Sequence, residues 1–151
     1  METSQLAKRG SRWSAIQPVF GALLGVTTVA LFTVGPQATL RMTIEAPVGN
    51  IVFFTIFSLV VFLVFWLWRA VRRLLLLEVC ATPFLRIAGG YTFIVSMLSG
   101  VILMKRIGIL NWERFSPFYH YSIYVIYGAV CLGAVVELEQ YVAKRFSATV
   151  A

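Results

Sequence analysis

The stretch APVGNIVFFTIFSLVVFLVFWLW, residues 46–68, decides the fold of this chain. It contains no Lys, Arg, Asp or Glu, and it is long enough to cross a bilayer, because a transmembrane helix needs about 20 mostly apolar residues. Three further stretches are also free of these charged residues, at 13–40, 87–104 and 115–136. The sequence therefore predicts four transmembrane helices, at about residues 15–34, 48–68, 87–104 and 118–137.

The composition of the whole chain agrees with this reading. Hydrophobic residues make up 60% of the 151 residues and charged residues only 13%, whereas a soluble domain carries roughly 25% charged residues. The chain therefore has too few charged side chains to build a water-facing surface around one core. We expect an all-α integral membrane bundle that forms a single domain over residues 1–151, because no repeat or long linker divides it.

Proline and glycine mark the expected ends of these helices. Gly35-Pro36 should end the first span. Thr82-Pro83 and Ser116-Pro117 each place a capping residue before a proline, which is the pattern of a helix N-terminus.

The distribution of Lys and Arg predicts the orientation in the membrane, because cytoplasmic loops are enriched in these residues. One side of the proposed spans holds nine basic residues and the other holds four, and three of those four lie in the 105–114 loop. We therefore expect both termini to be cytoplasmic. The nine are Lys8, Arg9, Arg12, Arg69, Arg72, Arg73, Arg86, Lys144 and Arg145.

Motifs for catalysis are missing from the sequence. The centres of the four spans hold no Asp, Glu, Lys or Arg, and the single histidine, His120, excludes bis-histidine haem ligation within the chain. We expect no catalytic residues, no cofactor and no metal site. The net charge of +7 comes from residues at the span margins, so no nucleic-acid partner is expected. Cys80 and Cys131 should lie at different depths and remain free thiols.

The segment RAVRRLLLLE, residues 69–78, is the most informative local feature. Its arginines suit an anionic leaflet, and its leucines fall beyond the expected membrane boundary. The leucines could be covered by the ends of other helices, by the headgroup layer or by a partner subunit. We predict a partner-binding or lipid-binding segment that comprises Arg69, Arg72, Arg73, Leu74, Leu75, Leu76 and Leu77.

Glu137 and Glu139 end the fourth span. They should lie at the same depth in the membrane as the arginines of residues 69–73, which end the second span. We hypothesise that Glu137 or Glu139 pairs with Arg69 or Arg73. The alternative is that each side chain reaches separately to water and lipid phosphate.

Small residues at four-residue spacing predict close helix packing, either within the bundle or in a dimer. On the fourth span, Tyr121, Tyr124 and Tyr127 recur every three residues. With His120, Tyr124 and Tyr127 could line a quinone or lipid cleft, or they could serve for packing and interfacial anchoring. The small residues concerned are Gly21, Gly25, Ser96, Gly100, Ala129 and Gly133.

The leading functional hypothesis is a non-catalytic structural or accessory subunit of a larger membrane complex. The expected partners are the lipid bilayer, anionic lipids, and other membrane subunits or further copies of the chain. The alternatives are a pore or transporter that forms by self-association, a tetraspan trafficking or membrane-organising protein, and an enzyme or redox anchor. Which membrane holds the protein is open.

Overall fold

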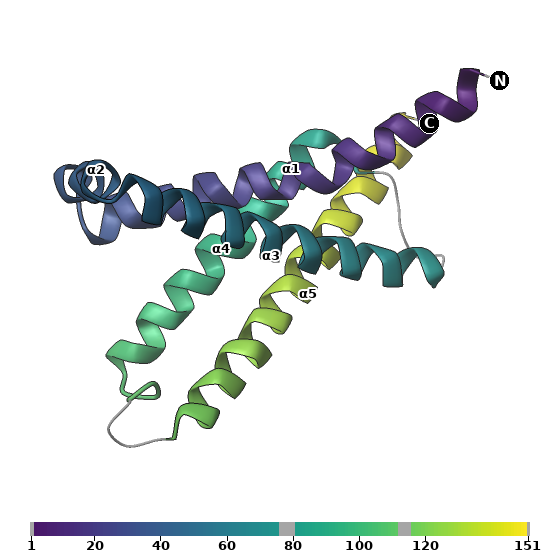
Figure 1. Ribbon diagram of the computed structural model, residues 1–151. Coiled ribbons are helices and arrows are strands. Elements are labelled where there is room, and N and C mark those ends of the chain that lie inside the picture. The colour runs from purple at the N-terminus through teal and green to yellow at the C-terminus, as the bar shows by residue number, and fades with distance from the viewer. Residues whose placement is uncertain (1, 76–80, 112–115, 151) are drawn as a thin grey trace.

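The computed structural model describes residues 2–75, 81–111 and 116–150, and gives only the backbone for residues 2–15 and 147–150. Over these ranges the chain is helical (Figure 1), and four of its helices are long and apolar enough to cross a membrane. The predicted all-α class with four membrane-spanning helices is therefore confirmed. The elements are α1 (Glu2–Thr33), α2 (Pro36–Glu45), α3 (Pro47–Leu74), α4 (Pro83–Arg106) and α5 (Pro117–Val150).

The proline signals mark the helix boundaries as the sequence predicted. Pro83 is the first residue of α4, and the Thr82 side chain accepts a hydrogen bond from the Leu85 amide at 3.4 Å. Pro117 likewise begins α5. Gly35 separates α1 from α2 with a φ of 91°, a left-handed conformation that is accessible to glycine because it has no Cβ.

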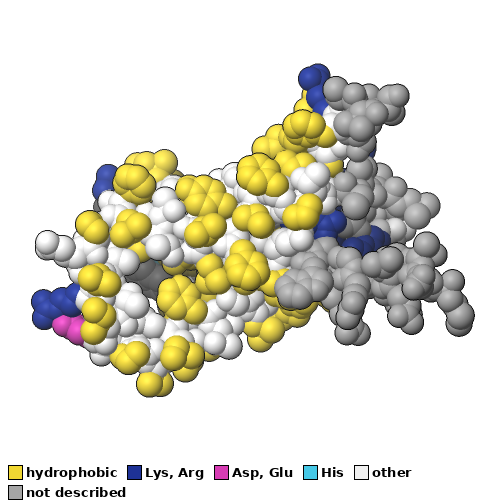
Figure 2. Space-filling model, turned by 90° about the horizontal axis from the view of Figure 1, so that it is seen from above, with side chains coloured by type: hydrophobic (Ala, Val, Ile, Leu, Met, Phe, Trp, Pro, Cys, Tyr) yellow, Lys and Arg dark blue, Asp and Glu magenta, His cyan; other side chains and the backbone are white. Residues whose placement is uncertain are grey.

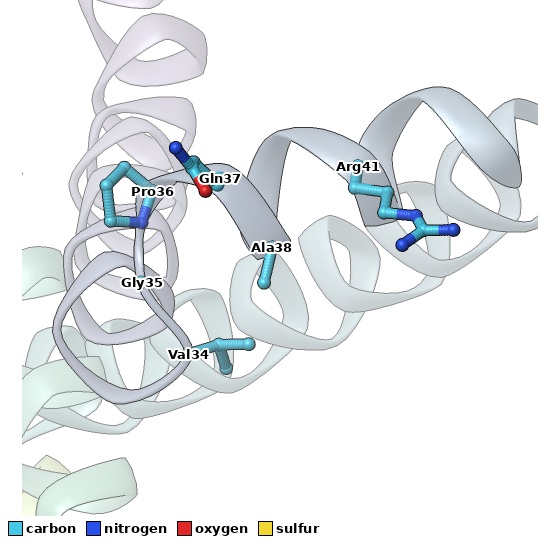
Figure 3. Close-up of a pocket in the computed structure, with 6 residues that line it drawn as sticks. All are labelled: Val34, Gly35, Pro36, Gln37, Ala38 and Arg41. Atoms are coloured by element: carbon cyan, nitrogen blue, oxygen red, sulfur yellow. The ribbon is translucent and has the colours of Figure 1, made fainter.

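The short helix α2 was missed by the sequence analysis. Its ten residues span about 15 Å at 1.5 Å per residue, which is too short to cross a bilayer. None of its residues is buried, and Arg41 and Glu45 form an ion pair one turn apart on its surface. An open cavity of about 510 Å³ lies where α1 turns into α2, lined by residues 34–38 and Arg41 (Figure 3).

The most extensive contact between helices is that of α1 with α4. α1 also lies beside α3, and α4 runs beside α5, and these two pairs are at an angle to each other (Figure 1). The first part of α1 and the last part of α5 lie at the same end of the molecule, as an even number of membrane crossings requires. Below, this end is called the Arg/Glu end, because it holds the arginine and glutamate side chains described in the next subsection.

The buried core joins the four long helices near the crossing. The rings of Phe65 and Phe93 meet edge to face at 5.5 Å between their centroids. Apolar side chains cover much of the outer surface, while charged side chains appear towards the two ends of the molecule (Figure 2). The core comprises Val19, Ala22, Val61, Phe65, Phe93, Ile94, Cys131, Leu132, Val135 and Val136.

Candidate functional site

Five buried polar side chains lie on the parts of α3, α4 and α5 that meet at the Arg/Glu end, and we call them the arginine cluster. Each is no more than 7% exposed. Polar groups at such burial are stable only when hydrogen bonds or opposite charges compensate for the lost hydration. The cluster comprises Arg69, Arg72, Arg86, Glu139 and Gln140.

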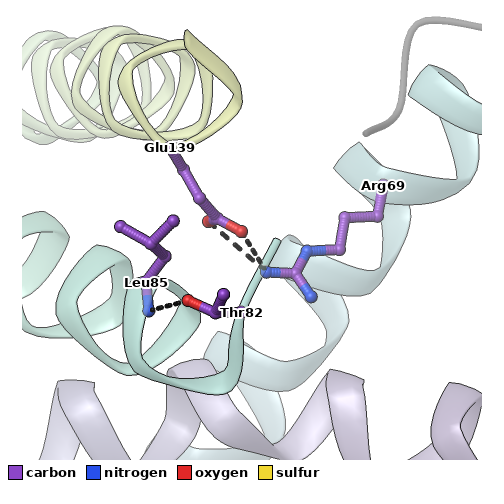
Figure 4. Close-up of polar contacts among 4 residues, drawn as sticks. All are labelled: Arg69, Thr82, Leu85 and Glu139. Carbon is purple, nitrogen blue, oxygen red and sulfur yellow. Dashed lines mark hydrogen bonds and ion pairs between the residues drawn. The ribbon is translucent and has the colours of Figure 1, made fainter. Parts of the chain in front are cut away.

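Arg69 of α3 and Glu139 of α5 form a buried ion pair. Nη2 of Arg69 lies 3.1 Å from Oε1 and 3.4 Å from Oε2 of Glu139, and both side chains extend over the first turn of α4 (Figure 4). Gly89 makes room for the carboxylate, because a Cβ at that position would lie 3.0 Å from Oε2 of Glu139. The structure thus brings together one of the four arginine–glutamate pairs that the sequence suggested.

The second ion pair of the arginine cluster is not one of the four pairs that the sequence suggested. Glu137 binds Nη1 of Arg72, and the glutamate side chain remains 60% exposed. Arg72 and Arg73 flank Arg69 on opposite sides of one helix face, and it is Arg72 that reaches α5. Arg73 is exposed.

Gln140 and Arg86 were not predicted from the sequence as members of this cluster, and Arg86 was counted only as a topological charge. Its side chain is 7% exposed, and among the described residues its Nε has no hydrogen-bond partner. The signal in the sequence was the pair Gly89-Gly90, which lies one turn later on the same helix face and is buried with it. Two adjacent glycines in an apolar helix indicate that other segments approach closely.

Glycines also set the separation between α1 and α4. A Cβ on Gly21 would overlap the carbonyl oxygen of Ile87, and a Cβ on Gly90 would overlap that of Pro18. A Cβ on Gly25 would lie 3.1 Å from the carbonyl oxygen of Tyr91. The predicted glycine pair on the first span therefore packs within the bundle, with its partner surface on α4.

Of the other predicted small residues, some pack against aromatic rings inside the bundle and one is exposed. Gly100 accommodates the ring of Tyr127, and a Cβ on Gly133 would lie 3.7 Å from Cη2 of the Trp68 ring. Ala129 is exposed, so it does not pack inside the bundle, and its packing in a dimer stays a prediction. At this level α5 contacts α4 through Tyr127 and Gly128, whose added Cβ would lie 3.5 Å from Cε of Met97.

Tyr127 is fixed between α4 and α5 by a hydrogen bond as well as by packing. Its hydroxyl donates to the carbonyl oxygen of Ser96 at 2.9 Å. Replacing Tyr127 with Phe keeps the ring against Gly100 and removes this bond, so we expect the free energy of unfolding to fall by about 0.6 kcal/mol, the average for such bonds in membranes. Thermal unfolding in mild detergent measures the change. A loss as large as that of Tyr127→Ala would show that the hydroxyl, and not the ring, dominates.

The suggested quinone or lipid cleft is occupied by protein where Tyr127 lies. His120 is fully buried, with Nδ1 3.0 Å from the carbonyl oxygen of Ser116 and its ring edge-on to Tyr119. Tyr124 is half-buried. A second open cavity, of about 650 Å³, lies elsewhere, beside the first turns of α3. Its lining comprises Thr43, Pro47, Asn50, Ile51, Phe54, Thr55 and Ser58.

The leucine run begins on exposed surface. Leu74 is 83% exposed and Leu75 is 61% exposed, so the ends of the other helices do not cover these two residues. Leu76 and Leu77 lie outside the described residues, as does Cys80. Cys131 is a buried free thiol.

Within the described ranges, no three His, Cys, Asp or Glu side chains are grouped as a metal site would require. Comparison of the chain with protein-family models, with curated proteins and with solved structures finds no match.

Proposed function

We propose that this chain is a non-catalytic accessory subunit of a larger membrane complex, and that Leu74 and Leu75 form part of its contact with a partner subunit. The observation that carries the proposal is the exposure of these leucines directly after buried, ion-paired arginines. Charged pairs favour the headgroup depth, where water and lipid phosphate are near.

The position of the leucines relative to that depth supports a protein partner. Leu74 and Leu75 follow Arg69 by five and six residues, which corresponds to about 7.5–9 Å along a helix. They therefore lie beyond the Arg69–Glu139 pair, on the side away from the hydrocarbon. A large apolar surface outside the bilayer core is typical of a protein–protein contact.

The outward face of α3 offers a second contact surface. In the most apolar stretch of 18 residues of α3, only 11% of the residues are buried inside the bundle. Trp66 and Leu67 are more than half exposed. Lipid covers such a face in a monomer, whereas a neighbouring helix covers it in a complex. Both surfaces lie on one helix, so a single partner could bind them together.

Purification in mild detergent tests the proposal. We expect the chain to co-purify with one or more different membrane subunits, and we expect Leu75→Gln to weaken that association. Ile107→Gln is the matched control, because Ile107 is 62% exposed, against 61% for Leu75, and follows α4 away from the Arg/Glu end. Recovery of a monomer alone from native membranes would contradict the proposal, and a complex of identical chains would favour self-assembly instead.

A further inference from the structure

Arg86 carries a buried positive charge for which the described residues supply no counter-ion. Its backbone amide bonds to Thr82, but its Nε has no hydrogen-bond partner in the described part of the chain. Its side chain is more than nine-tenths buried. A guanidinium cannot relieve burial by losing its proton, as a carboxyl or an amine can. Arg86 therefore requires an anion at its buried position.

The two neighbouring carboxylates bind other arginines. Glu139 holds Arg69, and Glu137 holds Arg72. Three buried guanidinium groups thus face two glutamates in this set, which leaves one positive charge in excess. The excess charge favours an external anion over a rearrangement among these side chains.

The position of Arg86 defines where that anion would bind. Arg86 precedes Gly89 and Gly90 by three and four residues, so the three share one face of α4. Gly89 borders Glu139 of α5, and Gly90 borders Pro18 of α1. Because helical side chains lean towards the N-terminus, the Arg86 guanidinium lies where α1, α4 and α5 meet, at the Arg/Glu end.

The first turn of α4 adds to the attraction for an anion. Pro83 begins the helix and Arg86 lies within its first turn. The N-terminus of a helix carries a partial positive charge and favours phosphate groups. Helix dipole and guanidinium therefore act on the same volume.

We propose that Arg86, with the first turn of α4, binds the phosphate group of an anionic phospholipid. Arginine binds phosphate through two parallel N–H···O bonds, a geometry that compensates well for its burial. A lipid is favoured over a soluble phosphate because apolar surface borders the site: Phe84 in the same turn of α4 is 77% exposed and can contact acyl chains. This proposal concerns the isolated chain and does not depend on the proposed accessory role.

Thermal unfolding in nanodiscs tests the site. The full chain is compared in discs of phosphatidylcholine alone and in discs that also contain phosphatidylglycerol. We expect the anionic lipid to raise the unfolding temperature of the wild-type chain, and we expect Arg86→Leu to abolish that rise. In phosphatidylcholine alone, Arg86→Leu should unfold at a higher temperature than the wild type, because it removes a buried charge that has no counter-ion there.

The matched control is Arg73→Leu, which removes an exposed arginine at the same end of the molecule. It should preserve the rise, because general attraction to an anionic surface is spread over many basic residues. Phosphatidylglycerol retained through detergent washing should fall roughly tenfold to hundredfold in Arg86→Leu, as expected for loss of charge-assisted hydrogen bonds. The proposal is overturned if the wild type shows no rise, or if Arg86→Leu keeps it.

Two further arms complete the test. Arg86→Lys keeps the charge and loses the two-pronged geometry, so it should retain the lipid less well than the wild type even if Arg86→Leu does not fold; equal retention overturns the proposal. Inorganic phosphate added to phosphatidylcholine discs separates the two sources of phosphate. If it alone gives the full rise, the ligand is a soluble phosphate and the lipid assignment is overturned.

Discussion

Replacing Glu139 with alanine is expected to lower the free energy of unfolding by about 3–5 kcal/mol, because it leaves the Arg69 charge buried without this carboxylate. The side chains of Arg69 and Glu139 are only 6% and 2% exposed, so water cannot replace the lost partner. Reversible unfolding of the purified protein in mild detergent measures the change.

Glu137 provides the matched control for Glu139. It lies two residues away and also binds an arginine, but its side chain is 60% exposed. Because 9% of the Arg72 side chain is exposed and water reaches only the glutamate side of this pair, Glu137→Ala should also lower stability, but by less than Glu139→Ala. Arg69→Glu should likewise be rescued by Glu139→Arg and not by Glu137→Arg. Equal losses at the two glutamates would contradict the assignment of the buried pair.

The second large effect is expected at the contact between α1 and α4. Gly21→Ala places a methyl group on the carbonyl oxygen of Ile87, and a backbone atom cannot rotate away as a side chain can. The two helices must separate, so we expect a loss of about 1–3 kcal/mol, the usual cost of overpacking. Gly90→Ala meets the backbone of Pro18 in the same way and should cause a similar loss.

Gly133→Ala distinguishes this close contact from a general sensitivity of helix glycines. Its added Cβ would lie 3.7 Å from the Trp68 ring, which is ordinary contact, and alanine favours helix by about 1 kcal/mol over glycine. We expect no loss of stability there. Equal losses at Gly21 and Gly133 in the same unfolding assay would show that the packing between α1 and α4 is looser than described.

The four long helices could be predicted because a charge in hydrocarbon costs so much that its absence over about 20 residues is informative. The short helix α2 could not, because its ten residues are too few to cross a membrane, and its apolar residues Ala38, Leu40, Met42 and Ile44 alternate with a period of two, which is not that of a helix. The helices α3 and α5 continue past the ends of the predicted spans, to Leu74 and Val150. Hydropathy marks the edge of the hydrocarbon, whereas Arg, Leu and Glu continue to favour helix beyond it.

The arginine cluster was predictable only in part. Equal depth at the ends of two spans was enough to suggest Arg69 and Glu139 as partners. Choosing Arg72 over Arg73 required knowing how α3 is rotated about its axis. The burial of Arg86 depends on the close approach of α1 and α5 to one face of α4, which the sequence signals only through Gly89 and Gly90.

Labelling of single cysteines with a membrane-impermeant thiol reagent, after replacement of Cys80 and Cys131, tests the four-span topology most directly. Cysteines at Gln37 and Ile107 should react from one side of sealed vesicles, and cysteines at Arg73 and Arg145 from the opposite side. Reaction of Gln37 and Ile107 from opposite sides would contradict the four-span arrangement.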